Sequence, residues 1–243
     1  EGPTDSTPAS LPLDEPGIFE YDNQVWEPKN YDDYDGGVTW RRAHAMSRNL
    51  GTIRVGEQVG FDNVVRVWKR VGVGTPPIAV PSITLGVFEL TPLEVAQAYT
   101  LFTNGGTVRP LRGLNYIQAG ARQLRPEPTK PRSVARPDTT FLVTNMLRSV
   151  LNEGTGPAAR GLGFTADAAG KSGTTNDQPD AWFVGFTPEL LTVVWVGFDD
   201  NTPIGLTGSQ AALPIWREFM KAAVAGRGSA QFEPPEGITF VEI

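Results

Sequence analysis

The sequence predicts an α+β fold, in which helices come first and an antiparallel sheet backed by one helix comes second. Apolar residues at helical spacing and helix-capping residues dominate the chain from residue 38 to residue 152. Two apolar, strand-type segments follow at 181–186 and 190–198, joined only by Thr187-Pro188-Glu189. Such a short connection pairs its strands antiparallel, and the separation of helices from strands is typical of the α+β class.

The composition is that of a globular chain that can form a hydrophobic core. Its 243 residues are 40% hydrophobic and 20% charged. The net charge of −6 argues against a nucleic-acid-binding protein, which needs a surplus of Lys and Arg. The chain has no cysteine and one histidine, His44, which argues against a metal cluster and a Ser-His-Asp triad. We therefore expect no metal, no cofactor and no nucleic-acid partner.

Residues 1–37 are rich in Pro, Asp, Gly and Tyr, which is typical of loops. Packing against the rest of the protein is expected for Phe19, Tyr21, Val25 and Trp26, so we expect an ordered loop region. The alternative is a disordered acidic linker, which the aromatic residues disfavour.

Residues 38–160 are expected to be mainly helical, because apolar residues recur there at helical spacing. The expected helices span 38–46, 53–59, 61–71, 92–103 and 139–152. Thr39, Thr91 and Asp138 are the expected N-caps, and Thr91 begins a capping box with Glu94. Short strands or a hairpin are expected at 107–109, 114–118 and 123–125.

Residues 161–243 should supply the sheet strands and a C-terminal helix over 210–224, with Ser209 as its N-cap. A last strand is expected at 238–243. No apolar run approaches the roughly 18 residues of a membrane-spanning helix. We expect the whole chain, residues 1–243, to form a single domain.

The stretch best suited to bind or react with a ligand is Lys171-Ser172-Gly173-Thr174-Thr175. On a strand, Lys171 and Gly173 would share one face and Ser172 and Thr174 the other. Gly173 would let another backbone come close, and a carboxylate ligand would find a cation, hydroxyls and backbone N–H groups. A phosphate-binding P-loop is excluded because Thr165 stands where its first Gly is required. Taken alone, the stretch also fits an ordinary solvated turn.

Ser47-Arg48-Asn49, followed by Lys171-Ser172-Gly173, resembles the second and third motifs of penicillin-binding proteins and serine β-lactamases. The surrounding sequence narrows this resemblance to the transpeptidase domain of class A penicillin-binding proteins, the bifunctional cell-wall synthases. The matching stretches are 25–31, 45–49, 90–99, 104–106, 153–156, 170–175, 180–186 and 193–197. They follow the family's order and cover nearly the whole chain.

The resemblance implies a penicillin-binding-protein fold, with an antiparallel sheet flanked by a helical subdomain, and D,D-transpeptidase activity. In that reaction, a serine attacks the penultimate carbonyl of a peptidoglycan stem peptide ending in D-Ala-D-Ala. The terminal D-Ala leaves, and an amine of a neighbouring stem resolves the acyl-enzyme. β-Lactam antibiotics resemble the dipeptide and trap the serine. The resemblance also implies an extracytoplasmic location at the bacterial inner membrane, with an anchor in a preceding segment.

The resemblance assigns catalytic roles to three residues and substrate binding to four. Ser47 would relay a proton to the leaving amine, and Asn49 would hold the base lysine and the substrate amide. Lys171 would keep the groove positive. The substrate-binding residues would be Ser172, Gly173, Thr174 and Thr175, with the backbone N–H of Thr174 as one oxyanion donor.

The family's first motif, Ser-x-x-Lys, does not occur in this sequence, because none of its serines has a Lys three residues later. In the family this motif lies shortly before the region that matches residues 1–25. We therefore expect an N-terminally incomplete domain, inactive alone, whose nucleophile comes from an upstream segment of the same protein or from a separate chain. The alternatives are a β-lactamase or D,D-carboxypeptidase of the same fold, and a non-catalytic domain that binds peptidoglycan or a partner.

Overall fold

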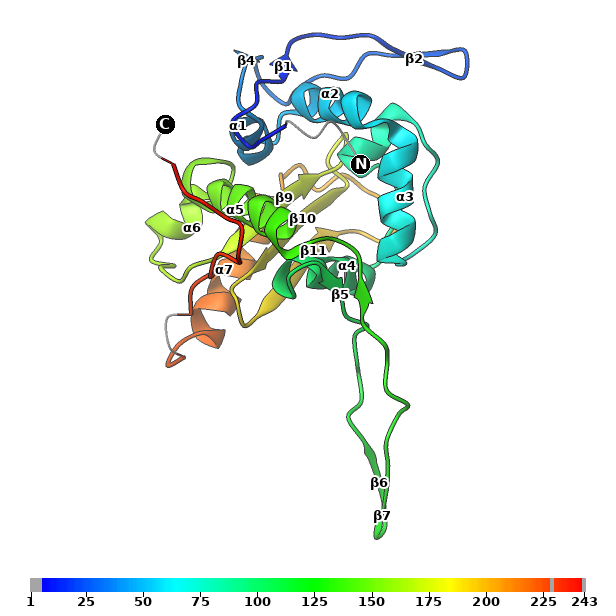
Figure 1. Ribbon diagram of the computed structural model, residues 1–243, viewed down its shortest axis with the longest axis vertical. Coiled ribbons are helices and arrows are strands. Elements are labelled where there is room, and N and C mark those ends of the chain that lie inside the picture. Colours follow the sequence, from blue (N-terminus) through cyan, green and yellow to red (C-terminus); the bar gives the residue numbers. More distant parts are fainter. Residues whose placement is uncertain (1–5, 228–229, 242–243) are drawn as a thin grey trace.

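The computed structural model of the chain, which describes residues 6–227 and 230–241, has the expected α+β architecture (Figure 1). Its elements in chain order are β1 (Leu13–Asp14), β2 (Phe19–Tyr21), β3 (Gln24–Trp26), β4 (Gly36–Gly37), α1 (Trp40–Ala45), α2 (Asn49–Val59), α3 (Phe61–Val71), η1 (Pro81–Leu85), α4 (Pro92–Thr103), β5 (Thr107–Val108), β6 (Ile117–Ala119), β7 (Arg122–Leu124), β8 (Arg132–Ser133), α5 (Pro137–Glu153), α6 (Pro157–Gly161), β9 (Ala169–Thr174), β10 (Asp180–Phe186), β11 (Leu191–Gly197) and α7 (Ala212–Ala223). None of the helices in the described part of the chain is both long and apolar enough to cross a membrane.

The central sheet has three antiparallel strands in the order β11-β10-β9. The strands expected at 181–186 and 190–198 are confirmed to within one residue at each end, and they pair antiparallel from Phe186↔Leu191 onward. β9 pairs with β10 from Ala169↔Phe186 to Thr174↔Ala181. In this sheet β9 has β10 as its only neighbour, so the Lys171–Thr174 segment lies on an edge strand.

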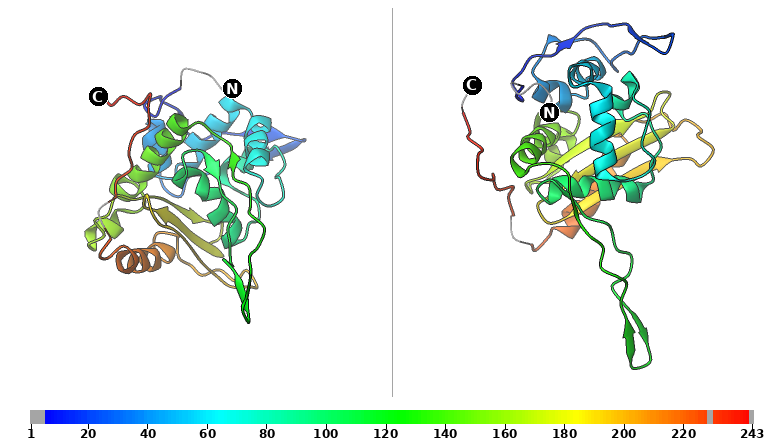
Figure 2. Two further views of the ribbon diagram at one scale, coloured as in Figure 1. Left: turned by 60° about the horizontal axis from the view of Figure 1, so that its bottom comes forward. Right: turned by 45° about the vertical axis from the view of Figure 1, so that its right-hand side comes forward.

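Helices cover both faces of this sheet (Figures 1 and 2). On one face, Trp216 of α7 contacts Phe183 of β10 within the largest buried cluster. On the other, Phe186 packs with Leu147 of α5 and Phe102 of α4. These two apolar layers fix β9 and β10 from both sides and so define where the edge strand lies.

Local sequence signals account for several helix ends. Thr39 caps α1 by accepting the N–H of Arg42 at 3.2 Å. Thr91 and Glu94 form the predicted capping box of α4, whose bounds match the predicted 92–103. α3 also begins and ends as predicted, and Gly72 follows it in the left-handed conformation that favours glycine.

Two predicted N-caps are wrong. Asp138 does not cap α5, because Pro137 occupies the first helical position and leaves Asp138 inside the first turn. Ser209 does not cap α7, because residues 207–211 form a turn in which Thr207 N donates to Gln210 Oε1. That turn delays the start of the helix to Ala212.

Helix α2 begins at Asn49, four residues before the predicted start at residue 53. Asn30 Oδ1 accepts the backbone N–H groups of Asn49 and Leu50 at 2.8 and 3.4 Å. These N–H groups would otherwise lack partners at a helix start. The cap therefore comes from a residue 19 positions away, which local sequence spacing does not indicate.

Residues 6–37 contain short strands where only loop was predicted; of the residues expected to pack down, Phe19 is buried but Val25 is 65% exposed. β1 pairs with β4, and β2 pairs with β3 across a turn at Asp22 and Asn23. Residues 1–5 lie outside the described residues. The predicted C-terminal strand is wrong for residues 238–241, which form no strand, and its last two positions lie outside the described residues.

A long arm leaves the body between β5 and β8 and carries the β6–β7 hairpin at its end (Figure 1). The two short strands predicted near 118 and 123 are found there, shifted by one to three residues. Residues 111–133 are exposed throughout. The arm therefore buries little apolar surface against the body.

Replacing residues 112–130 with a short Gly-Ser turn should change the free energy of unfolding by less than about 0.5 kcal/mol, the range of surface substitutions. The β5–β8 pair, which anchors the arm, would be kept. Urea unfolding followed by circular dichroism is the measurement. A loss of several kcal/mol would show that the arm packs against the body in solution.

Candidate active site

Ser47 lies at the junction of α1 and α2 in a strained backbone conformation. Its φ is +58°, in the left-handed region. The N–H of Arg48 reaches back to Ala43 O at 2.8 Å, which closes α1 in the arrangement that usually places glycine at this position. A non-glycine residue there costs on the order of 1 kcal/mol, and such strain clusters at functional sites.

Comparing Ser47→Gly with Ser47→Ala should reveal this strain, since both changes remove the hydroxyl. Glycine adopts positive φ freely, so Ser47→Gly should be the more stable variant by about 1 kcal/mol. Urea unfolding of the two proteins measures the difference. Equal stabilities would contradict a left-handed Ser47.

Lys171 on β9 faces Ser47, although the two residues are 124 positions apart in the chain. Its Nζ donates to Ser47 Oγ at 2.7 Å and to Ser172 O at 2.9 Å. Burial lowers the pKa of Lys171 to about 8. At neutral pH the amine is still mostly protonated, so a cation and a hydroxyl stand together at the sheet edge.

His44 lies on α1, close enough to Lys171 for the charge of that lysine to act on it. Its Nε2 is buried and finds no hydrogen-bond partner among the described residues. Burial, with a smaller contribution from the charge of Lys171, lowers the pKa of His44 to about 3. His44 is therefore a neutral side chain beside the Ser47–Lys171 pair.

The lowered pKa of His44 makes stability depend on pH. Between about pH 6.5 and pH 3 the unfolded chain binds a proton here that the folded chain does not, so the stabilisation is lost as pH falls. From about pH 6.5 to pH 5 the wild-type protein should lose about 1.5 kcal/mol more than His44→Leu. Urea unfolding of both proteins at the two pH values tests this. Parallel losses would show that His44 titrates normally.

Ser172 contacts Thr155, a residue to which the sequence assigned no role. The two hydroxyl oxygens lie 2.7 Å apart, and Thr155 N donates to Ala45 O at 3.1 Å. Gly154 makes this approach possible, because a Cβ there would lie 2.2 Å from Ala45 O. The loop after α5 therefore joins the end of α1 to β9, directly beside the Ser47–Lys171 pair.

The rest of the β9 segment is tied to its neighbours. Gly208 N donates to Thr174 Oγ1 at 3.0 Å, and a Cβ on Gly208 would lie 2.5 Å from Gly173 O. The close approach depends on the missing side chain of Gly208; a Cβ on Gly173 would instead lie 3.2 Å from Cβ of Trp182, so the backbone approach predicted for Gly173 is not found at its own Cβ position. Thr175 closes the β9–β10 turn by bonding to Asp180. Because Thr175 N points to β10 and N–H directions alternate along a strand, the N–H of Thr174 points to the open edge.

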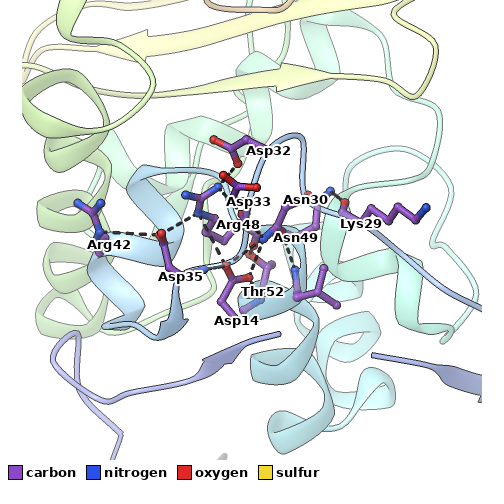
Figure 3. A network of polar contacts seen from close by, with 12 residues as sticks. Asp14, Lys29, Asn30, Asp32, Asp33, Asp35, Arg42, Arg48, Asn49 and Thr52 are labelled. Carbon is purple, nitrogen blue, oxygen red and sulfur yellow. Dashed lines mark hydrogen bonds and ion pairs between the residues drawn. The ribbon is translucent and has the colours of Figure 1, made fainter. Parts of the chain in front are cut away.

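The side chain of Asn49 is not directed at Lys171. Its Nδ2 donates to Lys29 O at 2.7 Å, within a network of polar contacts that surrounds Arg48 (Figure 3). The structure thus brings together Ser47, Lys171, Ser172 and Thr155. It leaves the Asn49 side chain outside this group, bonded to the backbone of Lys29. Among the described residues, no group of three or more His, Asp or Glu side chains could hold a metal ion.

Sequence reasoning did not single out Thr155, Arg48 or Asp14 as parts of this site. The signals were indirect: stretches 45–49 and 153–156 of the family resemblance contain Arg48 and Thr155 without any role attached to either, and no matching stretch contains Asp14. Their contribution depends on contacts between segments that are distant in the chain.

Known proteins are similar to this chain over most of its length. The family model of the penicillin-binding protein transpeptidase domain matches residues 12–221. Penicillin-binding protein 1A of Aquifex aeolicus is 39% identical over 218 residues, which are 88% of this chain and 30% of that protein. Penicillin-binding protein 1B of Vibrio cholerae is 36% identical over 221 residues, 90% of this chain and 28% of that protein.

Among solved structures, penicillin-binding protein 1A from Haemophilus influenzae superposes with a TM-score of 0.87 at 27% identity. The match covers 95% of this chain and 41% of that chain. The chain therefore has the fold of these transpeptidase domains and spans under a third of the length of the two curated relatives.

Proposed function

The chain belongs to the penicillin-binding protein transpeptidase family, and from this we propose that it forms part of a serine-type peptidoglycan D,D-transpeptidase. The observation that carries the proposal is the contact between Lys171 Nζ and Ser47 Oγ at 2.7 Å. It joins the two family motifs of this chain at one edge of the sheet, where a cation and a proton-relaying hydroxyl are both needed.

The nucleophile is a serine of a Ser-x-x-Lys segment that this sequence does not contain. Its lysine takes the serine proton, since a hydroxyl is a poor nucleophile until a base removes that proton. The charge of Lys171 favours the neutral form of that base by like-charge repulsion. The serine attacks the penultimate carbonyl of the stem peptide, Ser47 passes a proton to the departing D-Ala nitrogen, and an acceptor amine then takes the acyl group.

The β9 edge would bind the substrate carboxylate and the oxyanion. Lys171 supplies positive charge, and Ser172 and Thr174 supply hydroxyls. Gly173 and Thr175, the adjacent residues in the chain, complete the proposed substrate-binding segment. The Ser172 hydroxyl bonds to Thr155 and the Thr174 hydroxyl accepts from Gly208, so substrate binding would exchange or share these contacts. The N–H of Thr174, which points to the open edge, would donate to the oxyanion.

The role proposed for Asn49 requires its amide to leave Lys29 O when the Ser-x-x-Lys segment docks. We also propose that the chain forms a single domain with an extracytoplasmic location. Stem peptides ending in D-Ala-D-Ala and β-lactams are the proposed ligands.

Covalent labelling with a fluorescent penicillin, followed by intact mass, tests the proposal. The chain is labelled alone and together with a polypeptide that carries the Ser-x-x-Lys segment. An adduct on that polypeptide, formed only in the presence of this chain, supports a transpeptidase domain assembled from both. No adduct on either folded piece would refute the activity and favour a binding domain.

A further inference from the structure

Arg48, the middle residue of Ser47-Arg48-Asn49, is among the most buried charged side chains of the described residues, with 6% exposure. Its Nε donates to Asp35 Oδ2 at 2.9 Å and lies 3.8 Å from Asp14 Oδ2. Its NH1 contacts Asp32 and also donates to Asp33 O (Figure 3). A planar guanidinium held from several directions has little freedom to turn.

The backbone of Arg48 is fixed on both sides as well. Its N–H closes α1 by bonding to Ala43 O, and its C=O accepts the N–H and the hydroxyl of Thr52 at 3.2 and 2.8 Å as the N-cap of α2. Two residues, the C-cap Met46 and then Ser47, lie between the end of α1 and this anchored position. The left-handed φ of Ser47 therefore occurs directly before a residue whose backbone is hydrogen-bonded to both helices.

Asp14 links Arg48 to the N-terminal region. It is fully buried, and its carboxylate accepts from Asn30 Nδ2, Asp35 N and Gly51 N at 2.9, 3.0 and 3.3 Å. Asn30 in turn caps α2 through Asn49 N. Strand β1, which carries Asp14, is thereby coupled to α2, the helix that follows Ser47.

We propose that Arg48, held by Asp14, Asp32 and Asp35, is a positioning residue that keeps Ser47 in its left-handed conformation with Oγ against Lys171 Nζ. Arg48 does not touch the reacting atoms. The inference rests on the proposed function for its catalytic consequence, but the conformational claim concerns this chain alone.

The conformational test uses nuclear magnetic resonance of the full chain. The three-bond HN–Hα coupling and the 13C shifts of Ser47 report its φ in wild type, Arg48→Met, Arg48→Lys and Arg148→Met. Arg148 is the matched control, because it forms an ion pair of 2.9 Å with Asp167 in another part of the fold. We expect the left-handed signature to be lost in Arg48→Met, partly restored in Arg48→Lys and unchanged in Arg148→Met.

The catalytic test uses the same proteins with the Ser-x-x-Lys polypeptide and fluorescent penicillin. Arg48→Met should lower the acylation rate constant about 100-fold, as small misplacements of catalytic groups do, with penicillin affinity unchanged. If Arg48→Met does not fold, Asp32→Asn removes a half-exposed partner and should lower the rate in the same direction.

Wild-type Ser47 signals and wild-type acylation in folded Arg48→Met or Asp32→Asn would overturn the positioning role. If the wild-type pair itself forms no adduct, the proposed function fails, and the Ser47 signals alone decide whether Arg48 sets that conformation.

Discussion

Lys171→Met should lower the rate of penicillin acylation by about 10²- to 10⁴-fold, the usual contribution of a positioned proton-transfer or charged group. The substitution keeps the length and packing of the side chain but removes the cation and its contact with Ser47 Oγ. The measurement is the second-order rate constant of fluorescent penicillin labelling with the Ser-x-x-Lys polypeptide present. Lys221→Met, which changes an exposed lysine on α7, is the control and should label at the wild-type rate.

The pKa of Lys171 adds a pH signature to this prediction. Burial lowers that pKa to about 8, so Lys171 loses its charge as pH rises through this value. Acylation by the wild-type protein should decline over the same range. Lys171→Arg keeps a positive charge at all of these pH values and should lose the decline, even if it reacts more slowly. A decline that persists in Lys171→Arg would assign it to another group.

The parts of the fold that the sequence predicted well depend on local signals. The capping box at Thr91 and the glycine after α3 are short-range features, and both are confirmed. The antiparallel pair of strands joined at Thr187-Pro188-Glu189 is also a short-range feature, because so short a connection leaves few ways for the two strands to pair. The family model and the structural match confirm the transpeptidase assignment, which rested on motif order along the chain.

The features that were not predicted from the sequence depend on contacts between residues far apart in the chain. The start of α2 is set by Asn30, and its prediction at residue 53 failed because that cap is remote. The same holds for Thr155 against Ser172 and for Asp14 against Arg48, which are placed by tertiary packing. Motif resemblance pointed to Ser47 and Lys171, but the distance between them required the fold.

Trp216→Ala should reduce the free energy of unfolding by about 3–5 kcal/mol, as large-to-small changes in well-packed cores do. Trp216 is fully buried, its ring lies 5.0 Å from that of Phe183 and 5.1 Å from that of Phe164, and its Nε1 donates to Gly185 O at 3.1 Å. Against a typical total of about 5–15 kcal/mol, this loss leaves little stability. Because Gly185 and Phe183 lie on the strand that pairs with β9, the change should also loosen the edge that carries Lys171.

Urea unfolding measures the effect, and Trp195→Ala is the matched control. Trp195 lies on β11 with 36% exposure, and its Nε1 bonds to Asp180 Oδ1. Its loss should cost about 1 kcal/mol, since a partly exposed side chain leaves no closed cavity. Trp216→Phe should fall between the two, because it keeps an apolar ring but leaves Gly185 O without its donor. Equal losses in Trp216→Ala and Trp195→Ala would mean that the α7 face does not hold the sheet together.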